Sequence, residues 1–139
     1  LSMRSILLMM IFLTTPAVAD DQGQYKYREG IMQSIRGQMS ALGAIMRNKV
    51  QAENTLTHAR AMSDLAAILP GVFPKGSDVA KSETLPAVWV EPEKFKEATD
   101  EFITLTTEFL HAVEKDGDVS GTFRNLQKSC KSCHDKFRE

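Results

Sequence analysis

Apolar residues recur every three or four positions in four separate stretches of this sequence, and that spacing places them on one face of an α-helix. Segments rich in Pro, Gly and Asp separate the stretches, and no stretch alternates apolar and polar residues as a half-buried strand would. The four predicted helices run from Tyr25 to about Lys49, from Ala52 to Leu69, from Pro92 to about Lys115 and from about Ser120 to Phe137.

The segment between the second and third predicted helices is long. Residues 70–92 contain four of the five prolines without a sustained period, so we expect an extended connection that Phe73 and Trp89 pin to the core. The other two linkers are short, which favours antiparallel neighbours. The sequence therefore predicts an all-α fold, an antiparallel four-helix bundle with a crossover between its two helix pairs.

Three glycines, Gly30, Gly37 and Gly43, lie inside the first predicted helix. Each costs about 1 kcal/mol relative to alanine at a helix interior, so each needs a compensating reason. Close packing of a neighbour against this helix, or of a flat ligand against it, would supply one.

Residues 3–19 have the three-part form of a secretory signal peptide, with one arginine, an apolar run over residues 6–13 and an Ala-Val-Ala cleavage site. The apolar run is too short to cross a bilayer, which takes roughly 20 residues. Leu1 and Ser2 precede the first methionine and would be extraneous. We expect residues 1–19 to be removed and residues 20–139 to form one exported, soluble domain without a membrane anchor.

The charge balance argues against a nucleic-acid partner. The chain has 17 Lys and Arg residues against 18 Asp and Glu residues, a formal net charge of −1. No basic stripe is present to neutralise phosphates.

The candidate reactive residues lie near the C-terminal end, where the only two cysteines are in the run Cys130-Lys-Ser-Cys133-His134. This run matches C-x-x-C-H, the attachment site of a c-type haem, in which both thiols add to porphyrin vinyl groups and the histidine supplies an iron ligand. Residues three and four apart share a helix face. The two thiols and the imidazole can therefore address one macrocycle from one helix.

Three other interpretations of the cysteine pair compete with haem attachment. A thioredoxin-like dithiol lacks its expected βαβ setting, and a zinc site completed by His58 or His111 would draw ligands from distant helices. The third is a haem-free helical binding module with a Cys130–Cys133 disulfide. An enzyme is not predicted, because no carboxylate pair or nucleophile and base constellation is apparent.

With the bundle and the C-x-x-C-H run in place, residues 25–138 resemble the class II c-type cytochromes, the cytochrome c′ family. The segments that carry the resemblance are Tyr27-Arg28-Glu29 with Met32, Leu42-Gly-Ala-Ile45, Phe73-Pro-Lys-Gly-Ser77, Trp89 and Cys130-Lys-Ser-Cys-His-Asp-Lys-Phe-Arg138. The resemblance implies one haem c bound within the bundle and held covalently by the last helix. It also implies a periplasmic protein, often a homodimer through its first two helices.

The resemblance further implies roles for residues outside the C-x-x-C-H run. Met32 falls at the position over the iron face opposite His134. Arg28 and Glu29 match an Arg-Gln pair near the haem propionates, with Glu in place of the usual Gln, and Ser77 and Asp78 fall where connection residues touch the haem. Arg138 follows His134 by four residues and, on a continuing helix, would sit beside the imidazole.

Two functions are compatible with this family, and Met32 decides between them. A five-coordinate iron with only His134 bound would take up small gases such as nitric oxide or carbon monoxide and exchange electrons with a small redox protein. A six-coordinate His134/Met32 iron would suit electron transfer alone. The Tyr-Arg-x-x-x-Met context favours the first, the cytochrome c′ type.

Overall fold

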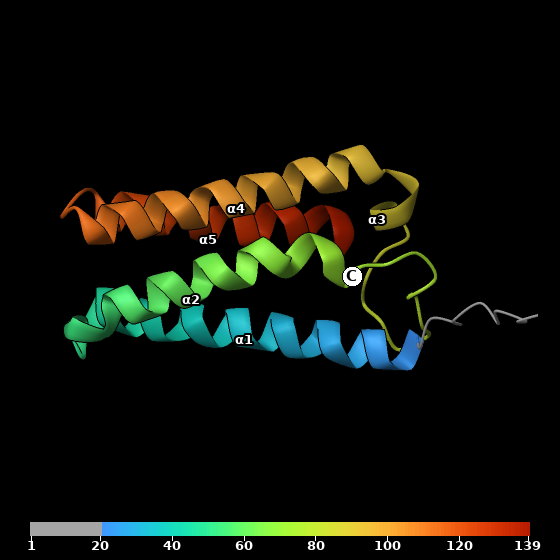
Figure 1. Ribbon diagram of the computed structural model, residues 1–139, viewed down its shortest axis with the longest axis horizontal. Helices are drawn as coiled ribbons and strands as arrows, with labels where there is room; N and C mark the ends of the chain where they lie inside the picture. Colours follow the sequence, from blue (N-terminus) through green and yellow to red (C-terminus); the bar gives the residue numbers. More distant parts are fainter. Residues whose placement is uncertain (1–20) are drawn as a thin grey trace, which may run out of the picture.

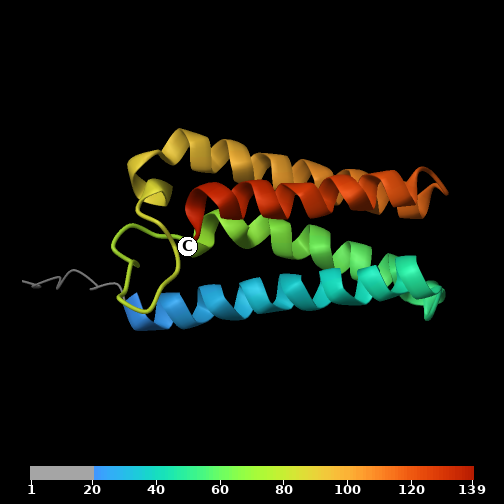
Figure 2. The same cartoon turned by 180° about the vertical axis from the view of Figure 1, so that it is seen from behind.

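Four long helices lie along a common axis and pack as two antiparallel pairs, α1 with α2 and α4 with α5 (Figures 1 and 2). The computed structural model describes residues 21–139, so the predicted signal peptide, residues 1–19, lies outside the described residues. The predicted all-α, antiparallel four-helix bundle is confirmed. The long helices are α1 (Asp21–Asn48), α2 (Thr55–Ile68), α4 (Pro92–Glu114) and α5 (Val119–Phe137).

The helix ends follow from local sequence. Helix α4 carries Pro92 at its first turn, where a missing backbone N–H costs little. The Asp118 side chain caps α5 by accepting a hydrogen bond of 2.8 Å from the Gly121 amide. Within the described residues, helix α1 includes the four residues before the predicted Tyr25, and the acidic Asp21 in this turn favours the helix.

Two segments differ from the prediction. The second predicted helix, from Ala52 to Leu69, divides into the 3₁₀ turn η1 (Ala52–Asn54), α2 and the 3₁₀ turn η2 (Leu69–Val72). The long connection contains a short helix, α3 (Ala87–Val90), that was not predicted. Four residues are too few to show a helical period, so the sequence pattern could not reveal α3.

The core fills the interior between the four long helices and extends under the connection. Leu42, Met62, Phe109 and Leu126 are completely buried at its centre. A second cluster joins α3, α4 and α5, in which the Phe95 ring meets Phe73 at 4.9 Å and Phe137 at 5.3 Å between centroids, both edge to face.

The connection is anchored where the sequence predicts. Phe73 packs against both core clusters and Trp89 packs against the second. The Trp89 indole N–H also donates to the carbonyls of Phe73 and Pro74, each at 3.1 Å. Both residues therefore pin the connection to the bundle.

Arg28 of α1 ties the same connection to the other side of the bundle. The residue is only 3% exposed, and its guanidinium donates to the Ser77 hydroxyl and carbonyl at 2.9 Å each and to the Val72 carbonyl at 3.2 Å. Ser77 follows Gly76, whose φ of 79° lies in the left-handed region that a turn needs here. We call this group of contacts the Arg28 clamp.

The helix pairs differ in how extensively they pack. Helix α1 packs on α2, α2 on α4 and α4 on α5, whereas α1 and α5 pack little against each other. The C-terminal end of α5 instead binds the connection, through an isolated antiparallel bridge between Thr84 and Arg138. The connection thus contacts both α1 and α5.

Two of the three α1 glycines, Gly30 and Gly37, are exposed, whereas Gly43 is buried. A side chain added at Gly30 or Gly37 would meet no heavy atom of another described element within 4 Å, and one at Gly43 would lie nearest the Arg47 side chain, at 3.1 Å. Among the described residues, close packing of a neighbour is therefore absent at Gly30 and Gly37. None of the described helices is both long and apolar enough to span a membrane.

The central core residues should dominate stability. Leu42→Ala removes a completely buried side chain from the bundle centre and should lower the free energy of unfolding by about 3 kcal/mol. Val90→Ala is the control, because Val90 is 75% exposed and its truncation should change stability by less than about 0.5 kcal/mol. Urea denaturation followed by circular dichroism measures both. Equal losses for the two variants would contradict this account of the core.

The Arg28 clamp should also be required for stability. Arg28→Leu leaves the buried Ser77 hydroxyl and two carbonyls without their donor, which should cost about 3 kcal/mol. Arg124→Leu makes the same chemical change at an exposed position of α5 and should be nearly neutral. Limited proteolysis should cut residues 72–82 faster in Arg28→Leu than in Arg124→Leu. Unchanged cleavage and stability would show that the clamp does not hold the connection.

Candidate functional site

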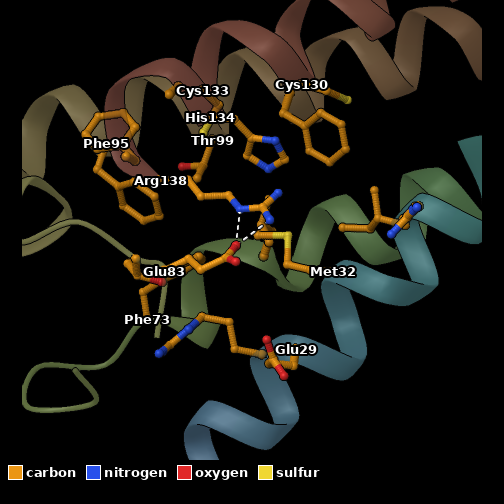
Figure 3. A pocket seen from close by; sticks show the side chains of 18 of the residues that line it. Glu29, Met32, Phe73, Glu83, Phe95, Thr99, Cys130, Cys133, His134 and Arg138 are labelled. Carbon is orange, nitrogen blue, oxygen red and sulfur yellow. Dashed lines mark hydrogen bonds and ion pairs between the residues drawn. The ribbon is translucent and has the colours of Figure 1, made fainter. Parts of the chain in front are cut away.

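A cavity of about 600 Å³ lies between α1, α4 and α5, at the end of the bundle that the connection covers (Figure 3). This volume is in the range of pockets that hold small molecules and cofactors. The lining is largely apolar, and the cavity lies where α1 and α5 pack little against each other. The fold therefore provides a site of cofactor size between these helices.

Helix α5 places three reactive side chains on one wall of this cavity. Cys130, Cys133 and His134 all line it, and the His134 ring points into it (Figure 3). Their spacing of three and four residues on a continuous helix produces this common orientation. The structure thus brings together the three residues of the C-x-x-C-H run.

The two cysteine side chains are half-buried, and neither is in the reactive thiolate form. Burial raises the pKa of Cys130, and burial together with the neighbouring Cys130 raises the pKa of Cys133. Both side chains are therefore thiols at neutral pH, unlike the thiolates of dithiol oxidoreductases or zinc sites. Both are also free, with no disulfide between them.

The imidazole of His134 is in the form that binds metals. Burial lowers its pKa, the Arg138 guanidinium lowers it further, and Asp135 and Glu83 act in the opposite direction. The net shift is below the ordinary value of 6.5, so the ring is mostly neutral at pH 7 and has a free nitrogen lone pair.

The α1 wall carries Met32, which extends into the cavity from the side opposite α5 (Figure 3). Met32 is partly buried and packs against the main core cluster. Glu29 is exposed and also lines the cavity. Arg28 lines it too, but its guanidinium hydrogen bonds go to the connection.

The two connection residues that were expected at the site do not line the cavity. Ser77 is completely buried and accepts the Arg28 hydrogen bond through its hydroxyl. Asp78 is exposed beside it. In this structure Ser77 supports the site through Arg28, and Asp78 places its negative charge near the same guanidinium.

Arg138 lines the cavity, but it is not on a continuing helix as predicted. Helix α5 ends at Phe137, and Arg138 is extended, with φ −134° and ψ 144°. The helix ends at the predicted Phe137, and the condition of a continuing helix is not met, because the Arg138 backbone pairs with Thr84 of the connection. Its side chain donates through Nε to Glu83 at 2.6 Å.

Sequence reasoning missed part of the lining. Phe95, Thr99 and Phe102 of α4 face the cavity, although the α4 stripe predicts only a core face. Glu83 lies in the aperiodic connection, where no sequence signal marks it. The α4 residues were missed because a helical stripe does not distinguish a core from a cofactor cavity.

The competing interpretations of the cysteine pair are not supported. Within residues 21–139 no group of three or more His, Cys, Asp or Glu side chains could hold a metal ion, so neither His58 nor His111 completes a zinc site. His58 instead hydrogen bonds Gln38 at 2.7 Å, and His111 is exposed. The described chain also has no βαβ unit for a thioredoxin-like dithiol.

The residues present fit a haem. The cavity has an apolar wall for a flat macrocycle, two thiols on one helix face that can form thioethers, and a neutral imidazole that can bind iron. A neutral metal-binding histidine alone would suit many sites. The two adjacent thiols make the arrangement specific for covalent attachment.

Comparison with known proteins identifies relatives over nearly the whole chain. Residues 23–138 match the family described as cytochrome c′. The chain is 32% identical to cytochrome c′ of Rhodospirillum rubrum, covering 90% of this chain and 88% of that protein. It is 30% identical to cytochrome c-554 of Cereibacter sphaeroides, covering 89% of this chain and 88% of that protein.

Solved structures show the same fold. Cytochrome c′ from Shewanella frigidimarina superposes with a TM-score of 0.80 at 24% identity, covering 88% of this chain and 98% of that one. Cytochrome c′ from Rubrivivax gelatinosus gives a TM-score of 0.77 at 26% identity, covering 86% and 97%. A variant of cytochrome c′ from Alcaligenes xylosoxidans was solved in its ferrous form with bound NO. It superposes with a TM-score of 0.80 at 17% identity, covering 88% of this chain and 98% of that one.

A family match over residues 23–138 and a relative 32% identical over most of both chains agree with the bundle and with the cysteine and histidine wall of its cavity. This chain belongs to the cytochrome c′ family, whose members are haem proteins rather than enzymes.

Proposed function

We propose that this chain carries one haem c, attached through Cys130 and Cys133, with His134 as an axial ligand of a five-coordinate iron that binds nitric oxide or carbon monoxide. The observation that carries the proposal is the placement of both thiols and the imidazole on one wall of a cavity of about 600 Å³. The family implies covalently bound haem c. When bound, the haem supplies an iron centre that changes oxidation state and binds diatomic gases.

The other walls of the cavity would orient the group and keep water away. Phe95, Phe102 and Thr99 of α4 form a buried wall next to the α5 residues. The Thr99 hydroxyl is already satisfied, since it donates to the Lys96 carbonyl at 3.0 Å. This wall therefore offers an apolar surface without a free donor, which favours a flat hydrophobic ligand.

Met32 controls the side of the cavity opposite His134. Its packing against the main core cluster would hold the thioether as a steric barrier that admits only small ligands. Gas binding is supported by the Alcaligenes xylosoxidans neighbour, which was solved with bound NO. The same position of Met32, extending into the cavity from α1 (Figure 3), favours one second candidate: a six-coordinate His134/Met32 iron that acts in electron transfer alone.

The residues expected near the propionates divide into two groups. Glu29 lines the cavity at its exposed edge, where its carboxylate would lie next to a propionate and repel it. We infer that Arg28, Ser77 and Asp78 act less directly. Arg28 and Ser77 hold the connection in place, and Asp78 contributes negative charge near Arg28.

We propose a homodimer through the first two helices. The open positions at Gly30 and Gly37 support it, because a side chain added at either would meet no heavy atom of another described element within 4 Å, which would admit a second copy at short distance. Tyr27, 53% exposed on the same helix, would add apolar area to such an interface.

Family members are typically periplasmic. We propose that residues 1–19 direct export of this chain and that the mature protein begins at Asp20. A small periplasmic redox protein or a diatomic gas would then be its partner. No nucleic acid or membrane is expected to bind it after cleavage.

Carbon monoxide should bind the reduced protein. We expect its visible spectrum to change on addition of the gas, and Met32→Ala to tighten binding roughly tenfold by removing the barrier, a change of about 1.4 kcal/mol. Met46→Ala is the control, because Met46 lies on the same helix but does not line the cavity. A wild-type spectrum that ignores the gas, together with a responsive Met32→Ala, would instead establish six-coordination.

Covalent attachment should require both cysteines. Intact mass after denaturation should show one haem on the wild type and on Ser132→Ala, which changes an exposed residue between the thiols. Each single variant, Cys130→Ala or Cys133→Ala, should retain less haem because one thioether remains, and the double variant should retain none. A wild-type chain without haem, two hydrogens lighter than its reduced mass, would be the disulfide-linked module instead.

A further inference from the structure

An ion pair between Glu83 and Arg138 lies on the cavity lining, near His134 (Figure 3). Arg138 donates through Nε to Glu83 Oε2 at 2.6 Å, and a second guanidinium nitrogen contacts the same oxygen. The pair joins the connection to the residue that follows α5. Both side chains are about half exposed, 58% for Glu83 and 50% for Arg138.

The backbone holds both partners in place. Thr84 and Arg138 form an antiparallel bridge, the Glu139 amide donates to the Glu83 carbonyl at 2.9 Å, and the Leu85 amide donates to the Phe137 carbonyl at 2.8 Å. Exposed ion pairs usually contribute little, because two long side chains must be ordered to form them. Here the paired backbones fix the two Cα positions beforehand and reduce that entropic cost.

Both partners line the same cavity as His134, and the Arg138 backbone amide donates to the His134 carbonyl at 3.0 Å. Of the four other ion pairs that the structure records within residues 21–139, none joins two residues of this lining. The Glu83–Arg138 pair is therefore part of the site, although Glu83 is far from the C-x-x-C-H run in the sequence.

We propose that Glu83 is a positioning residue, which fixes the Arg138 guanidinium next to His134 and thereby sets the contribution of that positive charge to the reduction potential of the iron. The proposal rests on the proposed function, since it needs a haem bound by His134. Oxidation of the iron adds one positive charge to the site, so a fixed cation beside its ligand disfavours the oxidised state. A cation that moves freely into solvent has a weaker effect, because water and salt screen it.

A double-mutant cycle on the haem-loaded protein tests the proposal. Arg138→Gln should lower the potential and change the ratio of reduced to oxidised haem, at a fixed solution potential, on the order of fivefold. In a Glu83→Gln background the same replacement should change the ratio by less than about twofold, because Arg138 is no longer held at the site. Spectroelectrochemical titration of the four proteins measures these ratios.

Conservative variants separate positioning from mere charge. Glu83→Asp retains the negative charge but shortens the side chain. In this background Arg138→Gln should change the ratio of reduced to oxidised haem more than it does with Glu83→Gln, but less than it does in the wild type. Arg138→Lys retains the positive charge but loses the planar fork that binds the carboxylate, and its potential should lie between those of the wild type and Arg138→Gln. Asp100→Asn is the control, because Asp100 pairs with Lys96 on the exposed face of α4, outside the cavity lining, and should leave the cycle unchanged.

Each outcome separates this proposal from the proposed function. Covalent haem in the wild type with equal effects of Arg138→Gln in both backgrounds would mean that the two charges act independently, and the positioning role of Glu83 would be wrong. A potential unaffected by Arg138→Gln would also overturn it. A wild-type chain without haem would overturn the proposed function, and the role of Glu83 with it.

Discussion

The connection between α2 and α4 sets the geometry of the whole site, because it is the element that ties α1 to α5. These two helices carry Met32 and His134, yet they pack little against each other. On the α1 side the Arg28 clamp grips Ser77 and Val72, and on the α5 side Thr84 pairs with Arg138. The width of the cavity therefore depends on a segment that contains almost no regular structure.

The tie between α1 and α5 through the connection explains why a cavity remains inside a helical bundle. Four helices with apolar stripes would normally close on one another until their side chains interdigitate. The Phe95 ring stacks edge to face with Phe73 and Phe137, so the aromatic side chains at this end of α4 and α5 are occupied with each other. The main cluster, centred on Leu42 and Phe109, closes the opposite part of the bundle. The cavity lies between these two clusters.

The helices and the α5 wall could be predicted from the sequence because both depend on local periodicity. Residues three or four apart share a helix face wherever the helix packs, so Cys130, Cys133 and His134 had to face one region. Met32 is less constrained: its side of α1 follows from the same periodicity, but whether its thioether binds a metal depends on the distance between two helices. That distance is set by tertiary contacts that no spacing rule contains.

The two anchors of the connection, Phe73 and Trp89, could be predicted as apolar residues in a polar segment, but the path of its backbone could not. Arg138 was placed beside His134 on the condition that the helix continues, but α5 ends at Phe137 and Arg138 forms a backbone bridge to Thr84. Ser77 does not line the cavity, since its hydroxyl and carbonyl accept hydrogen bonds from the buried Arg28 guanidinium. A buried guanidinium must find several acceptors, and an irregular connection offers more of them than a helix whose carbonyls are already paired. The hydrogen bonds of the buried Arg28 guanidinium on α1 thus hold Ser77 away from the cavity lining, and Glu83 is the residue of the connection that lies there instead.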